Sequence, residues 1–162
     1  MNKTCLNNSH IKIGAKMVKF CHLEMPNSYT FLIEEHHGGR NTAGIFDVSH
    51  MAGVDFKGGE EVAFFEKIFA NDIKKICNDD KAIYGALLNE EGGILDDLII
   101  YHAQDKFRLV SNCSTREQNR QWYEKHAVEF GVEVVERSDM GILAIQGPDA
   151  LNKILSIERI NP

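Results

Sequence analysis

The sequence contains no apolar run approaching the about 18 residues that a membrane-spanning helix requires. Its four cysteines, at positions 5, 21, 77 and 113, lack C-x-x-C spacing, which favours reduced thiols over a disulfide framework. The net charge of −6 argues against a dedicated nucleic-acid binder, which usually carries a basic face. The first ten residues are polar and not rich in arginine, unlike a secretory or transit peptide. We therefore expect a cytoplasmic protein without membrane or nucleic-acid partners.

The chain is nevertheless long and apolar enough to form a hydrophobic core. The 162 residues are 43% hydrophobic and 26% charged, which suits one compact domain or somewhat more. With three prolines and no repeat or low-complexity tract, nothing reads as a long linker.

Local patterns predict a mixture of strands and helices. The central part predicts a helix over 60–70 and a hairpin of strands 82–88 and 95–101, followed by a strand over 107–113. Ser28 offers an N-cap for a helix over 29–37, which Gly38-Gly39 would end. Thr115 and Gln118 match a capping box for a helix reaching about 126. Residues 142–145 read as a buried strand, and a last helix opens at Gly147-Pro148. The predicted class is α+β, a mainly antiparallel sheet with helices packed on one face.

The most informative stretch is residues 92–101, where Asp96 and Asp97 lie inside an otherwise apolar run. Burying a charge among apolar side chains is costly unless the charge is paired or used. Because side chains alternate across a strand, the two acids are expected on opposite faces, each in its own surroundings. The alternative is structural: one or both acids bond to backbone N–H groups at the start of the strand.

A metal site is not expected. His36 and His37 are adjacent on a predicted helix, so their side chains diverge by roughly 100° and do not chelate one ion together. The order Glu-Glu-His-His also differs from the H-E-x-x-H arrangement.

Several short stretches, in order along nearly the whole chain, resemble the N-terminal part of the glycine cleavage system T protein (aminomethyltransferase) family. They are GAKMV at 14–18, EMP at 24–26, IEEHH at 33–37, AGIFDVSHM at 43–51, AND at 70–72, KAIY at 81–84, GGILDDLIIY at 92–101 and AIQGP at 144–148. Residues 20–23 depart from the family, whose members usually carry two small residues and a tryptophan before Glu-Met-Pro.

The resemblance implies a tetrahydrofolate-binding fold and a transfer reaction. The aminomethyl group arrives on the lipoyl arm of the H protein and passes to tetrahydrofolate, giving 5,10-methylenetetrahydrofolate and ammonia. Asp97 matches the family's key acid, so we expect it buried beside a pterin-shaped cavity. Met51, Tyr84, Val110 and Asn112 match residues around the same ligand.

Family members are roughly twice as long as this chain. We therefore predict one folate-binding region over 1–162, with 52–135 a candidate subdomain inserted between 1–51 and 136–162. The expected partners are the lipoylated H protein and either a C-terminal half or a second copy that completes the site. The alternatives are a non-catalytic folate-binding or assembly module and an inactive short form.

Overall fold

The computed structural model describes residues 2–77, 81–103 and 105–157. These residues fall into two compact units: unit 1, within 1–50 and 141–162, and unit 2, within 51–140. The boundaries lie close to those predicted for an inserted segment, and its status as a subdomain stays a prediction. No helix in the described part of the chain is long and apolar enough to cross a membrane.

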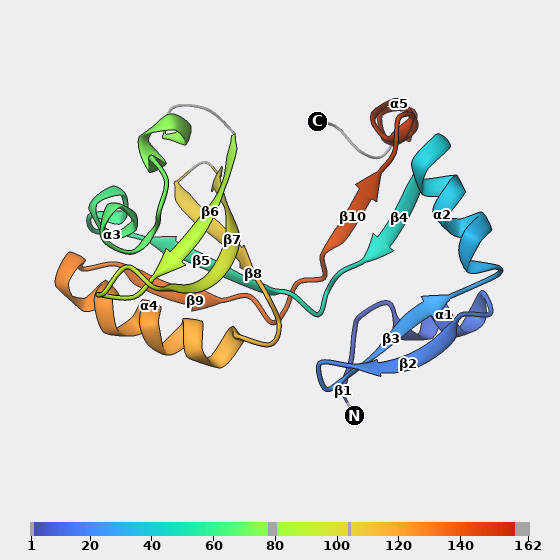
Figure 1. The fold of residues 1–162 in the computed structure, drawn as a ribbon, viewed down its shortest axis with the longest axis horizontal. Coiled ribbons are helices and arrows are strands. Elements are labelled where there is room, and N and C mark those ends of the chain that lie inside the picture. The colour runs from blue at the N-terminus through green and yellow to red at the C-terminus, as the bar shows by residue number, and fades with distance from the viewer. Residues whose placement is uncertain (1, 78–80, 104, 158–162) are drawn as a thin grey trace. The chain divides into compact units, whose positions relative to one another are not determined.

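Unit 1 contains two small sheets and three helices (Figure 1). Its elements are β1 (Asn2–Lys3), α1 (Asn7–Lys12), β2 (Lys16–Phe20), β3 (Leu23–Ser28), α2 (Leu32–Asn41), β4 (Gly44–Asp47), β10 (Leu143–Gln146) and α5 (Ala150–Leu155). In one sheet β3 pairs antiparallel with β2 and parallel with β1, whereas in the other β4 pairs antiparallel with β10.

Unit 2 is built on a five-stranded antiparallel sheet in the order β6-β7-β8-β5-β9. Its elements are β5 (Ala52–Lys57), α3 (Glu61–Ile68), the 3-10 helix η1 (Ile73–Ile76), β6 (Ala82–Leu88), β7 (Ile94–Ala103), β8 (Lys106–Ser111), α4 (Arg116–Phe130) and β9 (Glu133–Glu136). Figure 1 shows α4 running beside β9.

The hydrophobic core lies in unit 2, on one face of this sheet. Phe56, Ile100 and Leu109 from the strands pack with Phe65 of α3 and Tyr123 of α4, and all five are at most 1% exposed. Residues of η1 join the same cluster. All three helical segments therefore cover the same face, and the α+β class with helices on one face of an antiparallel sheet is confirmed.

One glycine of unit 2 is required by a close backbone approach. Gly59 has φ +77°, and a Cβ there would lie 2.4 Å from the carbonyl oxygen of Phe130. Gly131 ends α4 in the left-handed conformation, at φ 65°, so this helix runs about one turn beyond the predicted end near residue 126. The two glycines allow the turn after β5 and the end of α4 to pack together.

Unit 1 buries little apolar surface by comparison. Met25 is its single buried hydrophobic side chain among the described residues. Its large hydrophobic residues are mostly exposed, including Phe31, Leu32, Ile33, Ile45, Phe46, Leu143, Leu151 and Leu155. The expectation that 142–145 forms a buried strand is therefore wrong in this respect, because β10 has one sheet neighbour and is partly exposed.

The predicted start and stop of the helix over 29–37 are also wrong. Ser28 ends β3 instead of capping a helix, and α2 runs on through Gly38-Gly39 to Asn41. The carboxylate of Glu35 accepts hydrogen bonds from the backbone N–H groups of Tyr29 and Thr30, at 2.7 and 2.5 Å. These bonds hold the residues before α2 in a turn, so the helix begins later than expected.

Candidate functional site

The five residues selected from the sequence fall within unit 2, on or beside the sheet face that no helix of the unit covers. Tyr84 pairs with Ile99 of β7, Ile99 pairs with Val110 of β8, and Val110 pairs with Gly53 of β5. These four residues form one row across the sheet, with side chains on the face opposite the core. We call this face the open face.

Asp97 lies on the same face, two residues from Ile99 along β7, and it pairs with Ala86 of β6. Continued alternation places Met51 and Asn112, which flank β5 and β8, on this side as well. The sheet therefore gathers all five candidates, although they come from four separate parts of the sequence.

The two acids divide as their alternation predicts. Asp96 is 7% exposed on the core face, whereas Asp97 is exposed on the open face. The expectation of a buried Asp97 is therefore wrong for this chain, because no described segment of unit 2 covers the open face around it. The buried acid of the pair is Asp96.

Asp97 nevertheless has local partners. The Tyr84 hydroxyl donates to its carboxylate at 3.2 Å, and the side-chain amide of Asn112 approaches the same carboxylate at 3.2 Å. The negative charge of Asp97, together with this hydrogen bond, raises the pKa of the Tyr84 phenol. Tyr84 therefore stays a neutral donor that points at the acid.

A second polar group borders the row of apolar residues on the open face. Asp55 accepts two hydrogen bonds from Arg108, at 2.6 and 2.8 Å, and one from Arg137 at 2.8 Å. Burial opposes ionisation of Asp55, but the hydrogen bonds and charges of the two arginines lower its pKa overall. The sequence reasoning gave these residues no role, since only the sheet register brings them together.

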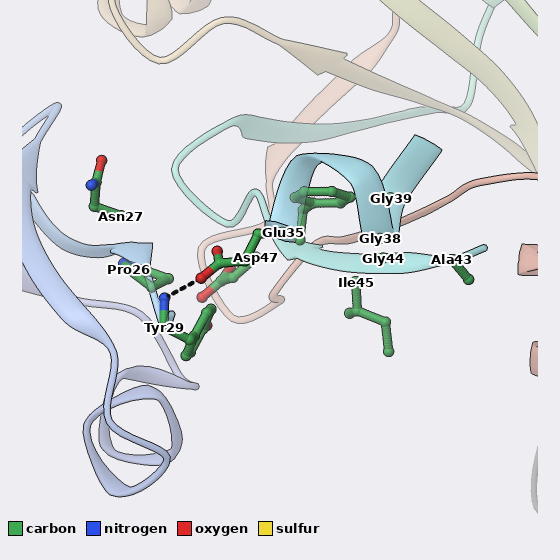
Figure 2. A pocket seen from close by; sticks show the side chains of 11 residues that line it. Pro26, Asn27, Tyr29, Glu35, Gly38, Gly39, Ala43, Gly44, Ile45 and Asp47 are labelled. Atoms are coloured by element: carbon green, nitrogen blue, oxygen red, sulfur yellow. Dashed lines mark hydrogen bonds between the residues drawn. The ribbon is translucent and has the colours of Figure 1, made fainter. Parts of the chain in front are cut away.

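Unit 1 holds a separate pocket of about 360 Å³ beside β4 and α2, shown in Figure 2. A chain of hydrogen bonds lies at its edge: the Tyr29 hydroxyl is 2.7 Å from His10 Nδ1, and His10 Nε2 is 2.8 Å from an Asp47 oxygen. Asp47 also accepts from the Thr4 hydroxyl and the backbone N–H of Ser49. Its carboxylate is thus engaged with the chain itself, so this arrangement joins α1, β4 and the segments around Thr4 and Tyr29 within unit 1.

The described residues contain no group of three or more histidine, cysteine, aspartate or glutamate side chains placed to hold a metal ion.

Known protein families and structures include matches to this chain. The family described as GCVT N-terminal domain matches residues 6–159. The chain belongs to this family. The resemblance found in the sequence motifs is confirmed.

Two similar proteins are both named aminomethyltransferase. The aminomethyltransferase of Xanthomonas oryzae pv. oryzae is 46% identical over 156 residues, which are 96% of this chain and 42% of that protein. The aminomethyltransferase of Stenotrophomonas maltophilia is 44% identical, over 97% of this chain and 43% of that protein.

A solved structure agrees with the fold. The chain is similar to the crystal structure of glycine cleavage system aminomethyltransferase T from Bartonella henselae, with a TM-score of 0.86 and 33% identity. This likeness covers 95% of this chain and 43% of that one. The chain therefore spans about two fifths of the length of the relatives that it matches.

Proposed function

We propose that the open face of unit 2 is one wall of a tetrahydrofolate site in an aminomethyltransferase of the glycine cleavage system. The observation that carries the proposal is the grouping of Tyr84, Asp97 and Asn112 beside the apolar residues of one row of the sheet. A flat heterocycle binds best against an apolar surface with a few fixed polar groups at its border. Ile99, Val110 and Gly53 provide such a surface, since Gly53 adds no side chain to it.

The proposed reaction moves one carbon between two carriers. The lipoyl arm of the H protein brings the aminomethyl group as a sulfur–CH2–NH2 adduct. Tetrahydrofolate gives up the hydrogens on its two reacting nitrogens, and the carbon becomes a methylene bridge between them. Ammonia and a free thiol on the lipoyl arm are the other products.

Asp97 has an electrostatic role in this proposal. Positive charge develops on nitrogen as the carbon–nitrogen and carbon–sulfur bonds change, and a carboxylate beside that nitrogen stabilises it. Asp97 also accepts a hydrogen bond from a pterin N–H. Tyr84 and Asn112, which both contact Asp97, keep the carboxylate in place on the sheet.

The exposure of Asp97 limits what this chain does by itself. An acid open to water stabilises charge much less than one in a water-excluded site. We therefore propose that polypeptide equivalent to the part of the relatives that this chain does not span covers the open face. The Tyr84 and Tyr101 side chains on the open face, which are 61% and 40% exposed, support this, because large exposed apolar patches mark interaction surfaces.

A titration of the isotope-labelled 162-residue chain with tetrahydrofolate, followed by NMR, tests the binding site. Weak binding is expected, with shifts concentrated in β6, β7 and β8. Asp97→Ala should weaken this binding at least about fivefold, the loss of one charged hydrogen bond. The matched control is Asp105→Ala, whose side chain is 81% exposed in the turn between β7 and β8. Absence of shifts on the open face, or equal binding by Asp97→Ala, would refute the site.

Catalysis needs a second experiment. The chain is mixed with lipoylated H protein and a separately expressed C-terminal part of the Xanthomonas oryzae relative, and methylenetetrahydrofolate is measured. Turnover that appears on mixing and disappears with Asp97→Ala supports the split transferase. Binding of tetrahydrofolate without any gain on mixing favours the alternative of a non-catalytic folate-binding module, which the exposure of Asp97 in the isolated chain already suits.

A further inference from the structure

The carboxylate of Asp96 is the best-satisfied buried charge of unit 2. Its Oδ1 accepts from the Asn112 side chain at 2.7 Å and from the backbone N–H of Asp97 at 2.9 Å. Its Oδ2 accepts from the Thr115 hydroxyl at 2.7 Å and from Asn119 Nδ2 at 2.5 Å. Burial opposes ionisation, but these hydrogen bonds lower the pKa of Asp96 overall. Asp96 is therefore a fixed acceptor with no capacity left for a ligand.

The hydroxyl of Thr115 is one of the donors to the Asp96 carboxylate. The sequence predicts that Thr115 caps α4, yet its hydroxyl makes no capping bond. It donates to Asp96, which lies nineteen residues earlier in the chain. The predicted capping box is thus wrong: the hydroxyl oxygen of Thr115 accepts from Asn119 Nδ2 at 3.3 Å and not from a backbone N–H of the first turn of α4.

The orientation of Asn112 follows from this network. Its Nδ2 faces three acceptors: Asp96 Oδ1 at 2.7 Å, and the backbone oxygen and Oδ1 of Asp97 at 3.2 Å each. A rotation of the amide by 180° would place its oxygen against these oxygens. The nitrogen is therefore held toward the two acids and the oxygen away from them. In the described part of the chain no donor bonds to Asn112 Oδ1.

We infer that Asp96 is a positioning residue that holds the Asn112 amide with its nitrogen toward the two acids and its Oδ1 turned outward, so that the open face selects pterins whose ring nitrogens carry hydrogen. This inference rests on the proposed function. Reduced tetrahydropterins carry N–H donors at N5 and N8, whereas these nitrogens are bare acceptors in oxidised folate. Two fixed acceptors on the protein match the first pattern and repel the second.

The same network predicts what an isosteric change does. Asp96→Asn places an NH2 group where one carboxylate oxygen accepted hydrogen bonds. When this group faces Asn112 Nδ2, two donors meet, and the Asn112 amide rotates to bring its oxygen inward. The open face then presents an N–H group in place of an oxygen. The shape of the site is kept while the polarity of one group is reversed.

The experiment compares the dissociation constants of the full chain for tetrahydrofolate and for oxidised folate, by NMR titration under reducing conditions. The wild-type chain should prefer tetrahydrofolate, and Asp96→Asn should reduce this preference about tenfold, the effect of one mismatched hydrogen bond. A ratio of two affinities is insensitive to general loss of folded protein. Asn112→Ala, which removes the presented oxygen from a half-buried position, should reduce the preference in the same way if Asp96→Asn fails to fold.

Two controls separate positioning from stability. Thr115→Val removes a donor from Asp96 Oδ2 and from the backbone oxygen of Asn112, but it leaves Asp96 charged and its Oδ1 bonded to the Asn112 side-chain amide, so stability should fall while the preference is kept. Asp105→Asn should change neither quantity. Without ligand, the Asn112 side-chain NH2 signals should be protected from exchange in the wild-type chain and lose this protection in Asp96→Asn.

The outcomes are distinct. If the wild-type chain binds neither ligand, the proposed function fails and the inference fails with it. If it prefers tetrahydrofolate and both Asp96→Asn and Asn112→Ala retain that preference, the proposed function stands and the inference alone is overturned. Unprotected Asn112 NH2 signals in the wild-type chain would also overturn the inference.

Discussion

Replacing Asp55 by asparagine is expected to lower the free energy of unfolding of unit 2 by about 3 kcal/mol at neutral pH. Asp55 is 4% exposed and receives three hydrogen bonds from Arg108 and Arg137. Removing one partner of a buried ion pair typically costs about 3–5 kcal/mol, since the remaining charge is left without compensation. We expect the lower end of this range because both arginine side chains are 27% exposed, so water can hydrate them.

The effect depends on pH with a definite sign. The two arginines lower the pKa of Asp55 in the folded chain, although its burial acts in the opposite direction. The stabilisation is therefore fully present above the ordinary aspartate pKa of about 3.9 and is lost as the pH falls through the lower pKa of the folded state. The difference between the wild-type chain and Asp55→Asn should accordingly shrink on acidification.

Urea denaturation followed by tryptophan fluorescence measures this quantity for unit 2. Trp122 is the only tryptophan of the sequence, and it packs against the core of this unit. Asp105→Asn is the control, since its exposed ion pair with Lys106 at 3.6 Å should contribute less than about 0.5 kcal/mol. A loss below about 0.5 kcal/mol in Asp55→Asn at neutral pH would refute the reasoning, as would a difference that persists unchanged in acid.

Three further predictions concern packing, backbone and charge. Phe56→Ala should cost about 3–5 kcal/mol in the same urea assay, because its ring is fully buried; a loss below about 1 kcal/mol would contradict this. Gly59→Ala should cost at least about 2 kcal/mol, since its new Cβ meets a backbone oxygen at 2.4 Å; unchanged stability would show that the turn adapts. His22→Gly should slow hydrogen exchange of the β2–β3 hairpin about fivefold, because the histidine has φ 66°; faster exchange would argue against strain there.

A fourth concerns the phenol on the open face. Asp97→Asn should lower the pKa of Tyr84 toward the ordinary value for tyrosine, since the carboxylate charge is the main cause of its rise. Ultraviolet absorbance titration of the variant against the wild-type chain measures the change. An unaltered titration curve would mean that the two side chains do not interact in solution.

Much of unit 2 was predictable because local and tertiary preferences agree there. The hairpin of β6 and β7 has β-branched strands, a turn containing Gly92 and Gly93, and the expected alternation of faces. The amphipathic spacing of Phe65 and Ile68 likewise predicted α3, whose apolar side is buried. In such segments the periodicity of the sequence and the demands of the core select the same structure.

The wrong predictions lie where the local structure depends on side-chain hydrogen bonds that the sequence pattern does not reveal. Gly38-Gly39 is a common helix stop, but here α2 continues and its end is held by the Thr42 hydroxyl, which donates to the Gly38 oxygen at 2.8 Å. The short helix α1 was not predicted, because its sequence is polar and shows no apolar periodicity. The buried side chain of Asn7 in α1 donates hydrogen bonds to Glu24 of β3, and no local sequence pattern predicts this contact.

The candidate site shows the same division. The sequence motifs selected Asp97 and the residues around it, whose roles stay a prediction, and strand alternation correctly separated Asp96 from Asp97. The exposure of Asp97 was not predictable, since it depends on what packs over the sheet. The role of Asn119 and Thr115 beneath the site was hidden as well, because their hydrogen bonds to Asp96 join residues of α4 and its start to β7.

The way the chain enters and leaves unit 2 has an evolutionary consequence. It enters through β5 and leaves through β9, which are neighbours in the sheet, and the backbone N–H of Arg137 bonds to the oxygen of Gly53. On the other side of the junction, Asp47 of β4 pairs with Leu143 of β10. A module whose two ends adjoin is transplantable: it can be grafted into, or excised from, a host between two paired strands without stretching either one.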